Sequence, residues 1–352
     1  MRPYIYLRAI RHVDYTVFCV QDGQKAYFDS VFDRTVAFSS GQQVKRCILE
    51  SILNELGETN SPVTFNFELK TDKSFGTVEP WSPCDPTFSD QLLGGWMRLI
   101  KDKESIKRRS PFSISAMRPI HPLLGYNHKE NITFDRSDKP ELHPINLRDS
   151  KGRILDKEEV NKFLAETGRT LPARTWIADN KRTGGLFVYD IAIDMRTLFS
   201  VSLNQYEPEV KPEIIEKLKQ QGWIESKNIF GSCLVAPRER REKLITAIAY
   251  GIINWQITSN QARTFSLMET LAIAISDNAN KLAGAIRADL VEDSEKPKAK
   301  LIIDESAGSE LFVSLPCRSY VAGIEASADA LDKAENKIKG MLSDFDYENQ
   351  LK

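Results

Sequence analysis

The sequence has little excess charge of either sign and no long apolar run. Lys and Arg number 48 against 49 Asp and Glu in 352 residues, which gives a formal net charge of −1. A basic field over the whole chain, of the kind that steers nucleic acid, is therefore excluded, although a locally basic groove is not. The longest apolar runs, such as Leu271–Ser276, are far too short to span a bilayer. We therefore expect no membrane partner.

The motifs of common catalytic and metal sites are missing as well. The five cysteines are scattered without a C-x-x-C pair, and the four histidines form no H-E-x-x-H. This pattern is typical of a reducing cytoplasm and predicts no structural zinc, no other metal and no cofactor. The absence of G-x-S-x-G argues against a serine hydrolase. A strand-like pattern begins within the first residues, so we expect no signal peptide and a cytoplasmic location.

What is present is the balance of a globular protein, with 41% hydrophobic and 28% charged residues. The alternation over Tyr4–Ile10 predicts a strand, and residues 14–40 favour a second extended segment and a long loop. Apolar residues repeat every four positions over Gln42–Leu56 and predict a helix. Ser39 or Ser40 would cap its start, and Gly57 would end it.

Regular patterns then become rare until residue 184. Strict alternation over 63–69 predicts a half-buried strand, but prolines, glycines and charges dominate 71–183. A stretch of this length in a compact fold is usually an insertion with its own role. Inside it, Asp156 and Glu159 have the spacing of a capping box and predict a short helix ended by Gly168.

The second half of the chain is regular again. The apolar segment Gly185–Asp194 predicts a central strand that is covered on both faces. Pro212 and Pro237 each begin a helix; the first ends at Gly222 and the second runs through Trp255. The last predicted elements are two strands and a helix, at 299–303, 311–315 and about 328–341.

Without the insertions, the order is strand, helix, strand, strand, helix, strand. This order predicts an α+β fold with a ferredoxin-like core of the RNA-recognition type, carrying large insertions. The fold alone leaves the function open, because it hosts many activities.

Three segments carry candidate chemistry. The first, 39–46, places small and amide residues and then Lys45 and Arg46 at the first turn of a helix. The free N–H groups and the dipole of a helix start favour a phosphate there, whereas cations at that position are unfavourable for the helix itself. A bound anion would offset that cost. The alternative is a pair of solvated cations.

The second and third segments are also polar. Between residues 98 and 118 there are seven Lys or Arg and two acids, a local balance of 7 − 2 = +5, and Arg108 and Arg109 lie in this run. Phosphate backbones are the usual partner of such a patch, although a charge run can also be a solvated face. The third segment, 258–264, contains Gln261 and Arg263, which can contact sugar and phosphate, or it is an ordinary polar loop.

Together these segments point to a known family. They are S-S-G-Q-Q-V-K-R (39–46), R-R-S-P-F-S-I-S-A-M (108–117), G-G-L-F-V-Y-D-I-A-I-D (184–194) and S-N-Q-A-R-T (259–264). In this order they resemble the DevR-type backbone subunit of Cascade, the CRISPR surveillance complex of type I systems, in the RAMP superfamily. Residues 85–97 look like the family's D-x-D-L-F-G-x-M element. The resemblance covers about residues 1–270 and departs from the family serines at Gly41 and Gln43.

The resemblance implies a shape like a right hand. The ferredoxin-like palm would be 1–70 and 184–320, with fingers at 71–118, a thumb at 119–183 and a C-terminal helix at 321–352. Copies would stack along one guide RNA, each thumb overlying the RNA of a neighbour and displacing a base. The implied partners are the guide RNA, further copies of this chain, other Cascade subunits, and target DNA or RNA read by base pairing.

The resemblance and the charge pattern together select candidate RNA-binding residues and no catalytic residue. Met117 is the apolar candidate for a wedge between bases, with core packing as its alternative. The candidate RNA-binding residues are Ser40, Gln42, Lys45, Arg46, Arg108, Arg109, Met117, Gln261 and Arg263.

Two other functions stay open at this stage. In related type III backbone subunits an aspartate of the first loop cleaves target RNA, and Asp29 and Asp33 lie in the matching loop here. Loop aspartates are more often turn formers. The DevR name also suggests an RNA-binding autoregulator, while the absence of a helix-turn-helix or zinc finger argues against direct reading of DNA.

Overall fold

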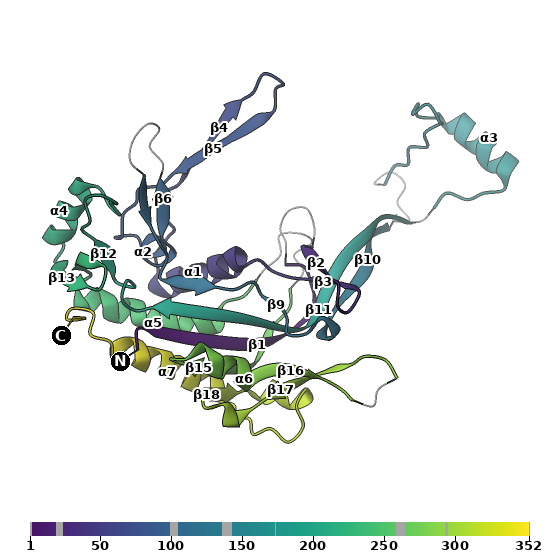
Figure 1. Cartoon of the computed structure of the whole chain (residues 1–352). Helices are drawn as coiled ribbons and strands as arrows, with labels where there is room; N and C mark the ends of the chain where they lie inside the picture. Colours follow the sequence, from purple (N-terminus) through teal and green to yellow (C-terminus); the bar gives the residue numbers. More distant parts are fainter. Residues whose placement is uncertain are drawn as a thin grey trace. The chain divides into compact units, whose positions relative to one another are not determined.

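Strand β1 (Tyr4–Thr16) lies in the middle of the main sheet, between two long antiparallel neighbours (Figure 1). The computed structural model describes residues 2–18, 24–98, 105–135, 143–172, 174–257, 265–292 and 295–351. They form two compact units, one of Met1–Tyr126 with Thr183–Lys352 and the other of Asn127–Arg182. No helix in these ranges is long and apolar enough to cross a membrane.

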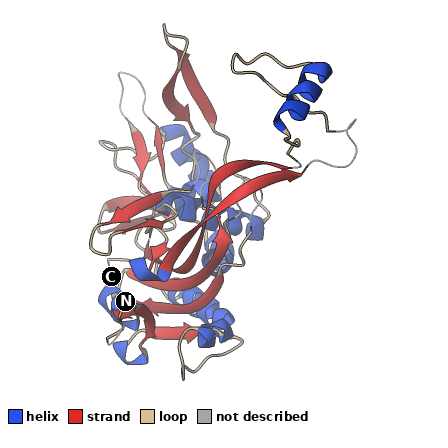
Figure 2. Ribbon diagram, turned by 90° about the vertical axis from the view of Figure 1, so that its right-hand side faces the viewer, coloured by secondary structure: helices blue, strands red, loops and turns tan. Residues whose placement is uncertain are grey.

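The strands, red in Figure 2, are connected by loops and helices of very different lengths. After β1 they are β2 (Ala26–Asp29), β3 (Arg34–Ala37), β4 (Thr64–Leu69), β5 (Phe75–Trp81), β6 (Trp96–Arg98), β7 (Ile106–Arg108), β8 (Phe112–Ile114), β9 (Arg118–Pro119), β10 (Gly125–Asp135), β11 (Arg174–Asp194), β12 (Ser200–Ser202), β13 (Ile224–Asn228), β14 (Gly231–Val235), β15 (Glu269–Ser276), β16 (Ile286–Leu290), β17 (Ala299–Ile303) and β18 (Glu310–Val313).

The helices include two long ones, α1 and α5, that pack against each other. The α-helices are α1 (Gly41–Leu56), α2 (Ser89–Gly94), α3 (Lys157–Thr167), α4 (Pro212–Gln220), α5 (Arg238–Asn254), α6 (Ala279–Ala285) and α7 (Ala330–Ser343). Three short 3-10 helices are η1 (Pro122–Leu124), η2 (Glu305–Ala307) and η3 (Leu315–Ser319).

The strand order confirms the predicted α+β fold with a ferredoxin-like core. In the main sheet β11 pairs with β8 and β9 on one side and with β1 on the other, and β1 pairs with β15. Every one of these pairs is antiparallel. Helix α1 connects β1 to the β8 region and α5 connects β11 to β15. This is the order of the split βαβ motif.

Two strands of that motif differ from the prediction. The second strand is β8 with β9, not the predicted strand at 63–69. The fourth is β15, whereas 299–303 pairs only with β16, and β18 adds to the edge of β15. The predicted half-burial of 63–69 is also wrong. All residues of β4 are exposed, because β4 pairs only with β5 and has no core beneath it.

The helix ends follow the expected capping chemistry. Ser40 is the N-cap of α1, and its hydroxyl accepts a hydrogen bond from the Gln43 N–H at 3.3 Å. Gly57 ends α1 in the left-handed conformation, with a φ of 67°. In the unit Asn127–Arg182, the predicted capping box of Asp156 and Glu159 is present at α3. The unit Asn127–Arg182 lies within the predicted thumb, 119–183. The boundaries of the palm, the fingers and the thumb stay predictions.

The main core lies where α1, α5 and α7 cover one face of the sheet. Helices α1 and α5 approach each other closely at Gly251. A Cβ atom there would lie 2.4 Å from Cγ1 of Ile52 and 3.1 Å from its backbone N. Helix α7 packs on α5 and buries Ala334 and Ile338. The C-terminal helix is therefore part of the main core.

We expect two helical glycines to respond in opposite ways to alanine. Gly251→Ala should lower the free energy of unfolding by about 1–3 kcal/mol, because the added methyl group forces α1 and α5 apart. Gly340→Ala in α7, where no atom lies within 4 Å of the new Cβ, should raise it by up to about 1 kcal/mol. Urea unfolding measures both. Equal effects at the two positions would contradict the close contact at Gly251.

Candidate nucleic-acid interface

The start of α1 is held against the segment that ends at Met117. The backbone N–H of Ser39 donates to the Met117 carbonyl at 2.9 Å, and the Met117 N–H donates back to Ser39 at 3.0 Å. Gly41 leaves no room for a side chain, since a Cβ atom would lie 2.5 Å from the Ile114 carbonyl oxygen. The fold thus brings together the first two candidate segments, 39–46 and 108–117.

The polar groups at this helix start divide into occupied and exposed ones. Ser40 is used as the cap. The Ser39 hydroxyl donates to Oε1 of Gln43 at 3.0 Å, and the Gln43 amide donates to the Phe18 carbonyl. Gln42 is exposed, and no hydrogen bond of its side chain is found in the described ranges. The side-chain amide of Gln42 is therefore accessible to a binding partner. The Ser40 hydroxyl is used within the chain and shapes the candidate site only by capping the start of α1.

The two cations of the first turns have different surroundings. Lys45 is half-buried and its ammonium group donates to the Gly94 carbonyl at 2.9 Å. Burial, with a smaller contribution from the charge of Arg108, lowers the pKa of Lys45 to about 8. Arg46 is exposed and pairs with Glu50, Nε to Oε1, at 2.8 Å. An exposed pair of this kind contributes little to stability, so Arg46 can exchange Glu50 for a phosphate.

Arg108 is a correction to the sequence-based site. Its guanidinium is buried and donates to the carbonyls of Leu92, Thr197 and Ser200. Its Nε also lies 3.8 Å from Oε2 of Glu209. Burial lowers the pKa of Arg108 to about 10. Arg108 therefore connects pieces of the chain internally, and its side chain cannot reach an RNA on the surface.

Met117 is the second correction. Its side chain is fully buried in the main core, so it fills the core and does not wedge between bases. An apolar residue next to charges gives the same sequence signal in both roles, and only the fold decides between them. What the segment presents to solvent is its cations, with Lys107, Arg109 and Arg118 exposed. Arg118 belongs to the basic run and directly follows the motif, but it is not among the predicted RNA-binding residues.

Some residues of the predicted site and of the basic run are not described by the structure. Gln261 and Arg263 lie outside the described residues, as do Lys101 and Lys103 of the basic run. Arg98 lies over the ring of Trp81, 5.4 Å from its centroid.

The two aspartates of the first loop have no metal-site geometry. Asp29 Oδ1 accepts the N–H groups of Val31 and Phe32 at 3.1 and 2.9 Å, which is the geometry of a turn former. Asp33 is exposed, with a φ of 47°. In the part of the chain that the structure describes, no cluster of three His, Cys, Asp or Glu is placed to hold a metal ion.

A cavity of about 430 Å³ lies beside the same segment, on the face of the sheet opposite α1. Its floor is an ion pair between Arg8 and Asp190, with Nε to Oδ1 at 2.6 Å and a second bond at 3.0 Å. Ser115 connects this floor to the helix start, because its hydroxyl accepts the Asp190 N–H at 2.8 Å. The two charges in the cavity therefore neutralise each other within this ion pair.

Neither a protein-family model nor a curated protein matches this chain. Among solved structures, a chain of a "CRISPR RNA-guided surveillance complex, pre-nicking" is similar with a TM-score of 0.44 and 9% identity, over 96% of this chain and 88% of that one. A chain of a "CRISPR RNA-guided surveillance complex" is similar with a TM-score of 0.38 and 11% identity, over 96% and 83%. These likenesses concern the course of the backbone and give no residue correspondence.

Substitution of the neighbouring residues Arg108 and Arg109 should distinguish a structural arginine from a surface arginine. Arg108→Met should lower the free energy of unfolding by about 3–5 kcal/mol, because Glu209 is left without its buried partner. Arg109→Met, at an exposed position, should change it by less than about 0.5 kcal/mol. Chemical unfolding followed by circular dichroism compares the two. If Arg108→Met were as stable as the parent protein, Arg108 would not be a structural residue.

Proposed function

We propose that this chain is a guide-RNA-binding backbone subunit of a CRISPR surveillance complex of the Cascade type. The observation that carries the proposal is the backbone pairing of Ser39 with Met117. It joins two of the family-like motif segments at the first turn of α1, on the palm of a ferredoxin-like fold. The order of the other motifs along the chain supports the same function.

The surface chemistry fits a grip on phosphates that ignores base identity. Gln42 and Arg46 are four residues apart on α1, so they share one exposed face of its first turns. Arg109 and Arg118 add exposed cations on the segment tied to that turn. Contacts of this type position a backbone without reading sequence. A subunit that must hold guides of any sequence needs contacts that do not depend on the bases. The target is then recognised by base pairing with the guide.

We also propose that the chain acts with several partners and that it has no catalytic activity. Further copies of the chain and other subunits would share the RNA, and the target nucleic acid would pair with it. The chain would hold RNA without cleaving it, in keeping with the use of Asp29 in a turn. RNA that co-purifies with the protein tests the function. A uniform-length guide with several bound copies is expected, whereas only the chain's own transcript would support an autoregulator.

Cleavage is tested separately, with target RNA paired to the bound guide. We expect the target to stay intact with both the parent protein and Asp33→Ala. Cleavage by the parent that Asp33→Ala abolishes would support the nuclease alternative instead.

Removal of Arg46 should flatten the salt dependence of RNA binding. If it contacts one phosphate, Arg46→Ala should reduce the slope of log affinity against log salt by about 0.7 for single-stranded RNA. Arg238→Ala is the matched control, because Arg238 is also exposed and also pairs with an acid four residues on, Glu242, at 2.8 Å. Fluorescence anisotropy at several salt concentrations measures both slopes. Equal slopes for the two variants would remove Arg46 from the interface.

Lys45 should make RNA binding depend on pH. Its pKa in the free protein is about 8, and a nearby phosphate would raise it, because an anion favours the charged form. The complex then holds more proton than the free protein at pH 8.5, so binding takes up protons and affinity falls as pH rises past 8. Calorimetry in buffers of different ionisation enthalpy measures this uptake. Lys45→Met should abolish it, and an unchanged uptake would exclude Lys45.

A further inference from the structure

The cavity of about 430 Å³ beside β8 is shaped by a row of residues across the sheet. Tyr6 on β1 lies opposite Ala192 on β11, and Ala192 lies opposite Ser113 on β8. Because the side chains of Ala192 and Ser113 are small, they leave space above the sheet next to Tyr6. Ala279 and Leu282 of α6 also line this space. The cavity thus combines an aromatic ring and aliphatic side chains with its charged floor.

The Tyr6 ring is held in position by its neighbours. It stacks on the Tyr4 ring, with centroids 5.6 Å apart and an angle of 18° between the planes. Tyr4 is fixed in turn, because its hydroxyl donates to Asp194 at 3.2 Å and accepts from Arg196 at 2.7 Å. The Arg196 guanidinium also lies 4.9 Å from the centroid of the Tyr4 ring. A ring that is fixed in advance loses little conformational freedom when a ligand stacks on it.

The polar groups of the cavity favour a neutral ligand that carries hydrogen-bonding groups. Arg8 and Asp190 neutralise each other, so a phosphate or an ammonium group would meet a like charge beside the opposite one. Asp190 still has acceptor capacity, because a carboxylate has about four lone-pair sites and Arg8 donates only two hydrogen bonds to it. In the described ranges, the hydroxyls of Tyr6 and Ser113 have no hydrogen-bond partner within the chain.

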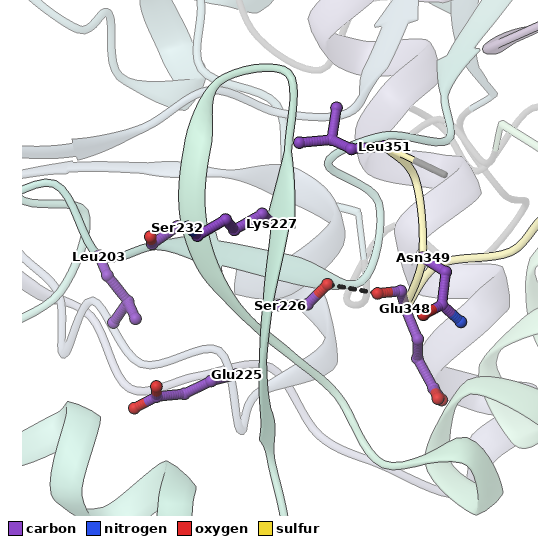
Figure 3. Close-up of a pocket in the computed structure, with 8 residues that line it drawn as sticks. All are labelled: Leu203, Glu225, Ser226, Lys227, Ser232, Glu348, Asn349 and Leu351. Atoms are coloured by element: carbon purple, nitrogen blue, oxygen red, sulfur yellow. Dashed lines mark hydrogen bonds between the residues drawn. The ribbon is translucent and has the colours of Figure 1, made fainter.

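A second cavity of the chain has a different lining. It has a volume of about 350 Å³ and lies between the β13–β14 hairpin and the C-terminal residues (Figure 3). Its described lining contains the charged residues Glu225, Lys227 and Glu348 and no aromatic ring. The Ser226 hydroxyl there is used within the chain, since it donates to the Glu348 carbonyl. An aromatic ring and unpaired hydroxyls thus distinguish the cavity beside β8 from this one.

We propose that the cavity beside β8 binds one unpaired nucleobase, stacked on Tyr6 and hydrogen-bonded along its edge by Asp190. Every nucleobase has an aromatic face that can stack on a tyrosine ring. Its edge is neutral and carries the N–H groups that a carboxylate and hydroxyls accept. The volume of about 430 Å³ lies within the range of about 300–1,000 Å³ that is usual for small-ligand sites.

The cavity is directly connected to the start of α1. Ser115 lines the cavity, and its backbone C would lie 3.0 Å from a Cβ atom on Gly41, the first residue of α1. We therefore expect the base to come from a single strand held at the start of α1. The inference rests on the proposed function only for this source of the base, because the cavity itself selects a base by its chemistry.

The test compares two strands that differ by one base. The first is a short RNA made only of stable abasic residues, and the second carries a single central adenine. Both strands have the same phosphates, so the difference in their affinities reports only the base. We expect adenine to increase the affinity of the parent protein about tenfold, as is typical of one base stacked on an aromatic side chain. Fluorescence anisotropy measures both affinities.

Two variants should remove the effect of adenine. Tyr6→Leu lacks the aromatic ring, and Ala192→Leu fills the space beside it. Tyr6→Phe retains the ring and should retain most of the effect. Tyr250→Leu is the matched control, because Tyr250 is also a partly exposed tyrosine, at 37%, but lies on α5 and outside the cavity. The affinity for the abasic strand should be equal for all variants, which separates base binding from a general loss of structure.

Free adenosine as a competitor distinguishes the two sources of a base. Displacement of the adenine strand from the parent protein to the affinity of the abasic strand would show that the cavity also accepts a free nucleoside. An adenine effect that adenosine does not reduce would show that the base enters only as part of a strand. Both results support the base site, provided that Tyr6→Leu and Ala192→Leu abolish the effect.

Three outcomes would overturn the proposal. They are a parent protein that neither prefers the adenine strand nor binds adenosine, an adenine effect that survives in Tyr6→Leu and Ala192→Leu, and an equal loss of the effect in Tyr250→Leu. Tight binding of both strands with equal affinity would overturn only this inference and leave the proposed function standing. Adenosine binding by a protein that holds no abasic strand would support the base site and reject the proposed grip on phosphates.

Discussion

The arrangement of the palm depends on one buried guanidinium. Arg11, on the central strand β1, is 1% exposed and donates to the carbonyls of Trp255 and Ile253 at 2.8 and 3.1 Å. Its charge lies 4.2 Å from the ring centroid of Trp255 and 5.5 Å from that of Tyr189 on β11. Burial lowers its pKa, and within the described ranges no acid pairs with it. The carbonyl groups at the end of α5 and the two rings therefore compensate the charge.

This contact fixes the end of α5 on the sheet, and the candidate interface follows from it. With α5 placed, Gly251 sets how closely α1 lies against it, through the contact with Ile52. The position of α1 brings Ser39 to Met117 and Lys45 to the Gly94 carbonyl. Residues far apart in the sequence thus meet at the first turn of α1 because α1 packs on α5 and Arg11 holds the end of α5 on the sheet. The interface is a property of the packed palm and not of a local motif.

The sequence predicts individual helices and strands better than it predicts which of them pack or pair with each other, because helix ends depend on nearby residues and strand pairing depends on distant ones. Helix α1 with its Ser40 cap and Gly57 stop, and the box of Asp156 and Glu159, depend on residues within one or two turns, so periodicity and capping chemistry suffice. Strand pairing depends on distant residues. The alternation in β4 indicates an apolar face correctly, but it carries no information on whether a core or a partner covers that face. The same limit explains Met117, whose burial depends on the pairing of Ser39.

Arg108 shows why the number of positive residues in a segment does not identify which of them face solvent. The positive residues of 98–118 look equivalent in the sequence, yet Arg108 donates to three carbonyl oxygens, one of Leu92 and two within residues 197–200. Arg11 and Arg241 are also buried at α5, where Arg11 donates to the Ile253 and Trp255 carbonyls. Arg241 donates to the Ala236 carbonyl at 2.7 Å and pairs with Glu348 at 2.5 Å. Arginine suits this role because its fork of donors stays charged at any physiological pH.

Arg108 and Arg241 each lie beside an acid, Glu209 and Glu348, so among these buried arginines it is Arg11, for which the described residues hold no acidic partner, that shifts the balance of charge between the interior and the surface. The whole chain carries −1, so each cation withdrawn into the interior without an acid leaves the solvent-facing side more negative than the total suggests. On such a nearly neutral surface, phosphate binds most favourably where exposed cations gather. Arg46, Arg109 and Arg118, on the two segments joined at the start of α1, are exposed cations of this kind. Where the fold places its arginines thus decides which of the positive charges counted in the sequence are exposed to solvent.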